Sequence, residues 1–193
     1  MKIIKLAVPS FTFVALALML GGCVGADAES DPDPNGTPVD VTPWKGATRP
    51  ELAEVLSAHP AGVQINANQI AWDNGKVVLN IPDEAHPENQ EAQARATVHG
   101  CPRGWFCFYQ HENFGGRRLQ FSDCSSGGVA QYLRNYGFEN QTTSWVANKS
   151  LSDVNVNDSD TNGFNLWDED GNSQSSNVGA RANDQADWFI CYL

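Results

Sequence analysis

The sequence is poor in basic residues: 12 Lys and Arg stand against 23 Asp and Glu, and the formal net charge is −11. Proteins that bind nucleic acids need clustered Lys and Arg to neutralise phosphates, so we expect no nucleic-acid partner. The four histidines form no His-Glu-x-x-His metal pattern, and the chain has no Gly-x-Ser-x-Gly nucleophile motif. We therefore expect a binding protein rather than an enzyme, with no required cofactor.

The chain also lacks an apolar run long enough to span a membrane as a helix. Residues 6–20 are mostly apolar, but a proline and polar residues interrupt them, and a spanning helix needs about 20 apolar residues. Two lysines precede this run and small residues follow it, an arrangement typical of secretory signals. Residues 1–22 are therefore predicted to be a signal peptide.

The signal ends in Leu20-Gly21-Gly22-Cys23, which resembles a bacterial lipobox. That resemblance implies that Cys23 becomes the lipidated first residue and holds the protein at the outer face of the cytoplasmic membrane. The alternative is a simple secretory signal cleaved near Ala26 or Ala28, which would leave the protein extracellular. Removal of residues 1–22, which carry two lysines and no acid, takes the net charge from −11 to −13. So acidic a chain fits an exported protein.

The chain has five cysteines, an odd number, and only one of them lies in the first half of the chain. If Cys23 carries lipid, four cysteines remain, enough for two disulfides in an oxidising compartment. Four cysteines allow three connectivities, and their spacing alone does not decide among them. The four are Cys101, Cys107, Cys124 and Cys191.

Composition divides the mature chain into four parts. Residues 23–47 are rich in Pro, Asp and Gly and predict a disordered tether. Residues 48–82 predict a small helix-plus-hairpin segment, and residues 83–96 are polar and predict a linker. Residues 97–193 combine Gly, Ser and Asn with short apolar alternations, which indicates an all-β domain.

Two local patterns define the segment 48–82. Thr48-Arg49-Pro50-Glu51 matches a capping box, with Pro at the start of a helix. Asn74-Gly75 lies between two strand-like runs, and both residues tolerate the positive φ of a type I′ hairpin turn. About 35 residues are marginal for independent folding. We therefore expect this segment to pack on the C-terminal domain.

Aromatic residues gather in residues 97–193, together with a weak internal repeat. Residues 166–172 echo residues 108–113, and residues 183–189 echo residues 140–146, but the second copy is shorter, with a strand missing or abbreviated. Sandwich domains need inward aromatic residues, so a core is favoured over a carbohydrate platform. The aromatic residues are Trp105, Phe106, Phe108, Tyr109, Phe114, Phe121, Trp145, Trp167 and Trp188.

The stretch Cys101-Pro-Arg-Gly-Trp-Phe-Cys107-Phe-Tyr, followed by Asn-Phe-Gly-Gly and a later Ser-Trp, carries a family resemblance. It resembles a βγ-crystallin Greek-key motif and, within that group, the bacterial peptidase inhibitors typified by a metalloproteinase inhibitor. The resemblance covers about residues 100–191. It implies a mainly β, βγ-crystallin-like Greek-key sandwich of two motifs, the second abbreviated.

The same resemblance implies a disulfide between Cys101 and Cys107, leaving Cys124 to pair with Cys191. The main rival connectivity joins Cys101 to Cys124 and Cys107 to Cys191. As a function, it implies a monomeric binding protein that blocks a secreted protease with a disulfide-stiffened β scaffold. In the typical inhibitor a second close cysteine pair brackets the reactive bond, and this chain has no such pair. The reactive bond is therefore unassigned, and the alternative is a non-inhibitory surface module of crystallin type, with or without calcium.

Two patterns bear on calcium. Residues 158–169 match the Asp-x-Asp-x-Asn-Gly-x5-Glu loop at every position, but helices do not flank them, so we favour an acidic turn before a strand at 164–167. The crystallin resemblance implies a second kind of calcium site, with the pattern two Asn or Asp, two variable residues, Ser or Thr, and Ser. Residues 139–144 keep the last two positions of this pattern but begin with Glu. Residues 183–188 keep the first two positions but lack the final Ser/Thr and Ser. We expect weak calcium binding at most. The candidate ligands are Glu139, Asn140, Thr143, Ser144, Asp158, Asp160, Asn162 and Glu169.

Overall fold

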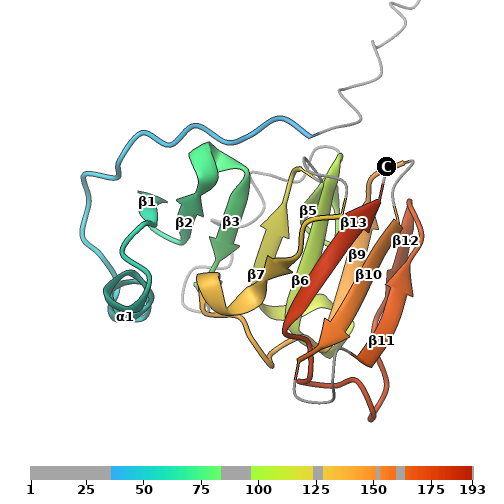
Figure 1. Cartoon of the computed structure of the whole chain (residues 1–193). Coiled ribbons are helices and arrows are strands. Elements are labelled where there is room, and N and C mark those ends of the chain that lie inside the picture. Colours follow the sequence, from blue (N-terminus) through green and yellow to red (C-terminus); the bar gives the residue numbers. More distant parts are fainter. Residues whose placement is uncertain (1–35, 84–96, 124–127, 151–152, 160–163, 193) are drawn as a thin grey trace, which may run out of the picture. The chain divides into compact units, whose positions relative to one another are not determined.

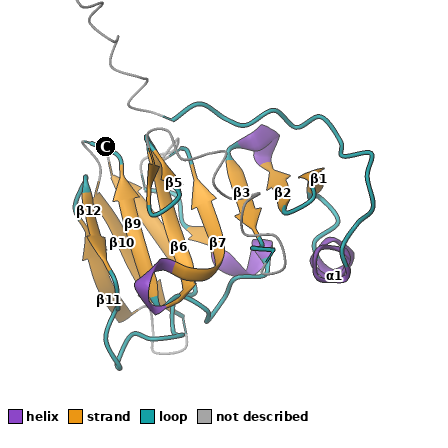
Figure 2. Cartoon of the chain, turned by 180° about the vertical axis from the view of Figure 1, so that it is seen from behind, coloured by secondary structure: helices purple, strands orange, loops and turns teal. Residues whose placement is uncertain are grey.

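The structure is a computed structural model that describes residues 36–83, 97–123, 128–150, 153–159 and 164–192 (Figure 1). All of these residues belong to one compact unit, residues 31–193. The described parts are mainly β, with a single α-helix ahead of two antiparallel sheets and a short two-stranded pair (Figure 2). None of the helices in the described parts is long and apolar enough to cross a membrane.

The α-helix α1 spans Pro50–Ala58 and begins with proline at its first position, as predicted. The predicted capping box is wrong, because Arg49 occupies the N-cap position and makes no side-chain cap bond. The Thr48 hydroxyl instead donates to Gln64 Oε1 at 2.7 Å. Leu52 and Val55 are the buried residues of the helix, and they pack into the core shared with the sheets.

Three strands follow the helix, one more than the predicted hairpin: β1 (Val63–Asn66), β2 (Gln69–Trp72) and β3 (Val77–Asn80). The hairpin at Asn74-Gly75 is confirmed, since β2 pairs with β3 antiparallel. Its turn is longer than a two-residue type I′ turn, and Asp73, Asn74 and Gly75 all have positive φ. The sequence analysis missed the first strand although its residues, Val-Gln-Ile-Asn, alternate apolar and polar, because four residues are the shortest run in which such an alternation is a signal.

The predicted tether is wrong for residues 36–47, which pack along the folded protein. Val39 N donates to Gly75 O at 3.0 Å, and Trp44 N donates to Gln64 O at 2.8 Å. A Cβ on Gly75 would lie 2.0 Å from Val39 O, so this close approach requires glycine. Val39 and Val41 supply enough apolar surface to hold the segment, which composition alone did not reveal. Residues 24–35 lie outside the described residues.

The C-terminal part forms two four-stranded motifs, so the predicted Greek-key fold is confirmed. The first motif comprises β6 (Trp105–His111), β7 (Gly115–Phe121), β8 (Gln131–Tyr132) and β9 (Ser144–Asn148). The second comprises β10 (Asp153–Asp158), β11 (Phe164–Glu169), β12 (Ser173–Ser175) and β13 (Trp188–Tyr192). Each motif gives its third strand to the other sheet, because β12 pairs with β9 and β8 pairs with β13.

The N-terminal segment extends one of these sheets. The seven-stranded sheet has the order β1-β2-β3-β7-β6-β9-β12, and the four-stranded sheet has the order β11-β10-β13-β8 (Figure 1). β3 pairs with β7 in register from Val77–Phe121 to Asn80–Arg118. The segment therefore packs on the C-terminal domain, as its small size predicted, by covering what would otherwise be a sheet edge.

Of the two segment matches in the predicted internal repeat, the structure confirms one. Trp145 on β9 and Trp188 on β13 do occupy equivalent fourth strands, and Asn140 and Asp184 before them share a φ of 55°. The match of residues 108–113 to 166–172 is wrong, since Trp167 lies on the second strand of its motif and Tyr109 on the first. No strand is missing among the described residues of the second motif. Its shortening falls on the connection between its second and third strands, residues 170–172, which corresponds to residues 122–130 in the first motif.

The core between the two sheets is aromatic, which confirms the preferred role for most of the aromatic residues. The Phe121 ring lies 4.7 Å from that of Phe189 and 6.0 Å from that of Phe108, measured between centroids. These rings come from both sheets, so the packing joins the two motifs. A second apolar cluster lies on the outer face of the seven-stranded sheet, where Val39, Val41 and Phe114 pack against Tyr109 and its neighbours.

Candidate functional site

The cysteine loop at the start of the C-terminal domain is closed by a disulfide between Cys101 and Cys107, as the family resemblance implied. Cys101 is the first residue of β5 (Cys101–Pro102), which pairs with β4 (Thr97–Val98), and Cys107 lies within β6. Their Cα atoms are 5.8 Å apart, and neither residue is exposed. The rival pairing of Cys101 with Cys124 is therefore wrong.

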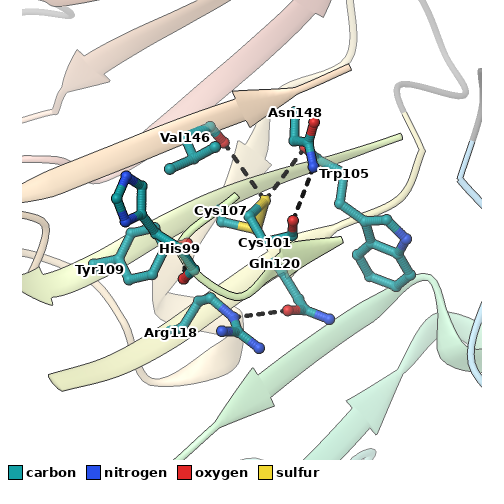
Figure 3. Close-up of a disulfide and its surroundings, with 9 residues drawn as sticks. All are labelled: His99, Cys101, Trp105, Cys107, Tyr109, Arg118, Gln120, Val146 and Asn148. Carbon is teal, nitrogen blue, oxygen red and sulfur yellow. Dashed lines mark hydrogen bonds between the residues drawn. A yellow bond between two sulfur atoms is a disulfide. The ribbon is translucent and has the colours of Figure 1, made fainter. Parts of the chain in front are cut away.

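Backbone and side-chain bonds hold this loop against the seven-stranded sheet (Figure 3). Gly104 N donates to Asn148 O at 2.6 Å, and Asn148 Nδ2 donates to Cys101 O at 2.9 Å. The Tyr109 hydroxyl donates to His99 O at 3.0 Å, and the His99 ring stacks on Phe114 at 3.7 Å. With both sulfurs buried and both strands bonded, the loop is a rigid brace.

A phenol and a guanidinium lie together beneath this brace (Figure 3). Burial raises the pKa of Tyr109 to about 12, although the nearby Arg118 opposes that shift. Burial also lowers the pKa of Arg118, whose Nε donates to Gln120 Oε1 at 2.9 Å. Both groups keep their ordinary charge at neutral pH, so they stabilise structure and offer no acid–base chemistry. The sequence analysis missed Arg118, because an Arg-Arg pair in a strand gives no sign of which of the two side chains the cysteine loop covers.

The other cysteines are only partly described. Cys191 is disulfide-bonded and almost fully buried in the main core. Cys23 and Cys124 lie outside the described residues, so lipidation at Cys23 and pairing of Cys124 with Cys191 stay predictions. Apart from Cys101 and Cys107, the described residues contain no close pair of cysteines that brackets a loop, and the reactive bond stays unassigned.

The residues of the loop-like calcium pattern do not converge. Asp158 ends β10, whereas the register places Glu169 opposite Val154, four residues away along the same strand. At about 3.3 Å per residue that offset is about 13 Å, too far for both carboxylates to bind one ion. Residues 164–169 form strand β11, which confirms the preferred strand at 164–167. Asp160 and Asn162 lie outside the described residues.

The crystallin-type candidate ligands make internal contacts. Thr143 Oγ1 donates to Gln110 O at 2.9 Å, and Ser144 Oγ donates to His111 O at 2.7 Å. The Glu139 carboxylate lies 3.9 Å from the Arg134 guanidinium, and Asn140 has a left-handed φ of 55°. These contacts tie the start of β9 to the turn after β6. No group of three or more His, Cys, Asp or Glu side chains gathers as a metal site in the described parts.

The sequence analysis listed Glu169 only as a candidate calcium ligand and did not predict that its side chain is buried. Glu169 has no exposed surface, and its Oε1 accepts a bond from Trp167 Nε1 at 3.0 Å. Its Oε2 has no hydrogen-bond partner among the described residues. Desolvation raises the pKa of Glu169 to about 8. The signal for burial was its position two residues after Trp167, on the same face of an apolar alternation.

The comparison with known families found one match for the braced domain. Residues 94–168 match the model of peptidase inhibitor family I36. This segment is therefore similar to that family. The I36 match covers the cysteine brace, the whole first motif and the first hairpin of the second, and it leaves out the helix and strands β1–β3. A peptidase inhibitor family is a class of binding proteins, and the match, together with the disulfide, indicates an exported protein.

Solved structures similar to about half of this chain include βγ-crystallin domains and a spherulin. A domain from Clostridium beijerinckii is 21% identical, over 45% of this chain and 95% of its own, with a TM-score of 0.36. Spherulin 3a from Physarum polycephalum is 20% identical, over 48% and 85%, with a TM-score of 0.35. A Ciona intestinalis βγ-crystallin is 16% identical, over 45% and 98%, also at 0.35. No curated protein matches this chain.

Proposed function

We propose that this chain is an exported protein that binds and inhibits a peptidase through its I36 domain. The observation that carries the proposal is the I36 match over residues 94–168. The Cys101–Cys107 brace supports it, because both sulfurs are buried and the loop is bonded to β9. A rigid scaffold loses little conformational entropy when it enters a protease cleft, so more of the contact energy remains as affinity.

The test is an inhibition assay with the full chain. Thermolysin-type and serine peptidases are incubated with increasing protein, with calcium and with chelator, and residual activity and intact mass are measured. Stoichiometric inhibition with the chain uncleaved is the expected result for at least one class. The Cys101→Ser/Cys107→Ser double variant should inhibit at least tenfold more weakly, because its loop is no longer held. Rapid digestion, or indifference of both classes at micromolar protein, would contradict the proposal.

A second candidate function is a structural surface module of crystallin type that inhibits nothing. The observation that favours it is the placement of the disulfide, which braces the sheet and does not bracket an exposed loop. Weak calcium binding at residues 139–144 would belong to this function. In the same assays, such a module would leave both peptidase classes active, and calcium would raise its melting temperature reversibly.

We further propose that Cys23 is lipidated and anchors the protein at the outer face of the cytoplasmic membrane. Cys23→Ala should release most of the protein into the medium, because no other membrane anchor is expected. Immunoblots of membrane and medium fractions measure the change. An Ala26→Asp/Ala28→Asp variant serves as control, since it blocks processing only if the signal is cleaved there. Wild-type protein recovered from the medium with an N-terminus beyond residue 23 would disprove the anchor.

A further inference from the structure

The outer face of the four-stranded sheet carries an aromatic row beside a polar row. On β13 the outward residues are Trp188, Ile190 and Tyr192, alternating with the buried Phe189 and Cys191. Their partners on β10 are Asn157, Asn155 and Asp153, in that order. β10 and β13 are neighbouring strands (Figure 1). Paired residues share a face of the sheet, so the two rows run side by side.

This aromatic row is exposed, unlike the apolar outer face of the other sheet. There, Val39, Val41 and Phe114 cover the strands. Here, Tyr192 is 50% exposed and Trp188 and Ile190 are half-buried. A neighbouring ring, Tyr132, is less available because the Arg134 guanidinium lies 4.4 Å from its centroid. A contiguous exposed patch of large apolar side chains on a folded domain marks a binding surface.

The polar row is a hydrogen-bonded network with fixed donors and acceptors. Asn157 Nδ2 donates to Asn155 Oδ1 at 2.7 Å, and Asn155 Nδ2 donates to Asp168 Oδ1 at 2.7 Å. Asn165 Nδ2 donates to the same oxygen at 3.1 Å. No described residue donates to Asp168 Oδ2, and Asp168 is exposed. Asn157 is buried and only orients Asn155. The row therefore offers the Asp168 carboxylate oxygen and the amides of Asn155 and Asn165 to a ligand that carries hydroxyl groups.

The dimensions and charge of the face select the ligand. Trp188 and Tyr192 are four residues apart on one strand, about 13 Å at 3.3 Å per residue, so a ligand touching both is extended. Asp153 and Asp168 repel anionic chains, as does the net charge of −11. Sugar rings offer an apolar C–H face for stacking on aromatic rings and a rim of hydroxyls for the polar row. We propose that this face binds a neutral polysaccharide chain, independently of peptidase inhibition.

Affinity electrophoresis of the full chain tests the proposal. Native gels contain hydroxyethylcellulose, xyloglucan, glucomannan or amylopectin, with carboxymethylcellulose as the anionic comparison. We expect retarded migration in at least one neutral gel and none in carboxymethylcellulose. Tyr192→Ala and Asp168→Ala should each weaken the retention at least fivefold. Trp44→Ala, which removes another exposed aromatic residue from outside this face, should leave it unchanged.

Three outcomes would overturn the proposal. If none of the four neutral polymers retards the chain, and circular dichroism shows that the chain is folded, the proposal is contradicted. Equal loss of retention in the Trp44→Ala variant would show that binding lies elsewhere. Concentration-dependent dimers in sedimentation velocity that disappear in Tyr192→Ala would assign the face to a second copy of this chain. Retention measured alongside the peptidase assay keeps the two functions distinguishable, because either can fail alone.

Discussion

Replacing Glu169 with glutamine should make the stability of this protein far less dependent on pH and should stabilise it in alkaline solution. Glu169 lies on the inner face of β11 with no exposed surface, opposite Val154 on β10. Desolvation raises its pKa to about 8, and the bond from Trp167 only partly opposes this. The buried carboxyl group loses its proton as the pH rises, although this environment favours the neutral acid over the charged carboxylate.

The direction follows from proton binding in the two states. The unfolded carboxyl has a pKa near 4.5, so between about pH 4.5 and 8 the folded state binds a proton that the unfolded state has lost. Stability contributed by this group is present below pH 4.5 and is lost as the pH rises to about 8. At about 1.4 kcal/mol per pH unit, the loss is on the order of 3–5 kcal/mol.

Urea unfolding at pH 5, 7 and 9 measures this effect. The wild type should lose free energy of unfolding steadily over that range, whereas Glu169→Gln should lose much less, since its amide stays neutral and can still accept from Trp167. Asp170→Asn is the matched control, because it removes the neighbouring acid, which is exposed, and should follow the wild type. Parallel pH profiles for wild type and Glu169→Gln would show that Glu169 ionises without cost.

A chain cut down to residues 97–193 should not fold stably, although it contains the whole Greek-key region. Among the described residues the main core has 21 buried members, and seven come from the N-terminal segment: Leu52, Val55, Ile70, Trp72, Val77, Leu79 and Ile81. At roughly 1.5–3 kcal/mol for each buried side chain, their burial contributes on the order of 10 kcal/mol. The net stability of a domain is about 5–15 kcal/mol, so the loss is comparable with the whole.

The cut also frees the edge of β7 and polar groups that now have partners. β3 pairs with four consecutive residues of β7, and the Tyr136 hydroxyl donates to Asp73 Oδ2 at 2.9 Å. An exposed, long edge strand invites aggregation. Lys76 also donates to Asp123 at 2.7 Å, across the same junction. The peptidase and polysaccharide assays therefore require the full chain.

Circular dichroism with urea titration and sedimentation velocity checks this prediction. Residues 36–193 serve as the control, because they keep the segment that packs along the sheet and lack only residues outside the described structure. We expect cooperative unfolding and monomers for residues 36–193, and aggregation or a transition without cooperativity for residues 97–193. A soluble 97–193 fragment that unfolds cooperatively would mean that the crystallin motifs carry their own core.

Local patterns in the sequence were sufficient for several features. Pro50 started its helix and Asn74-Gly75 turned its hairpin, because φ preferences act within a few residues whatever surrounds them. The Cys-Pro-x-Gly-x-x-Cys opening carried the resemblance to the inhibitor family, and that resemblance implied the Cys101–Cys107 pair that the structure contains. The all-β character of residues 97–193 followed from short alternating runs.

What the tertiary structure decided depends on partners far along the chain. Residues 36–47 look like a tether, yet Val39 and Val41 find an apolar sheet face to pack on. The third strands β8 and β12 have two and three residues, and they are strands only because the opposite motif supplies their hydrogen-bond partners. Glu169 and Asp168 are adjacent acids, but the side of the sheet buries one and exposes the other. Burial and register arise from long-range pairing, so short-range patterns alone did not determine them.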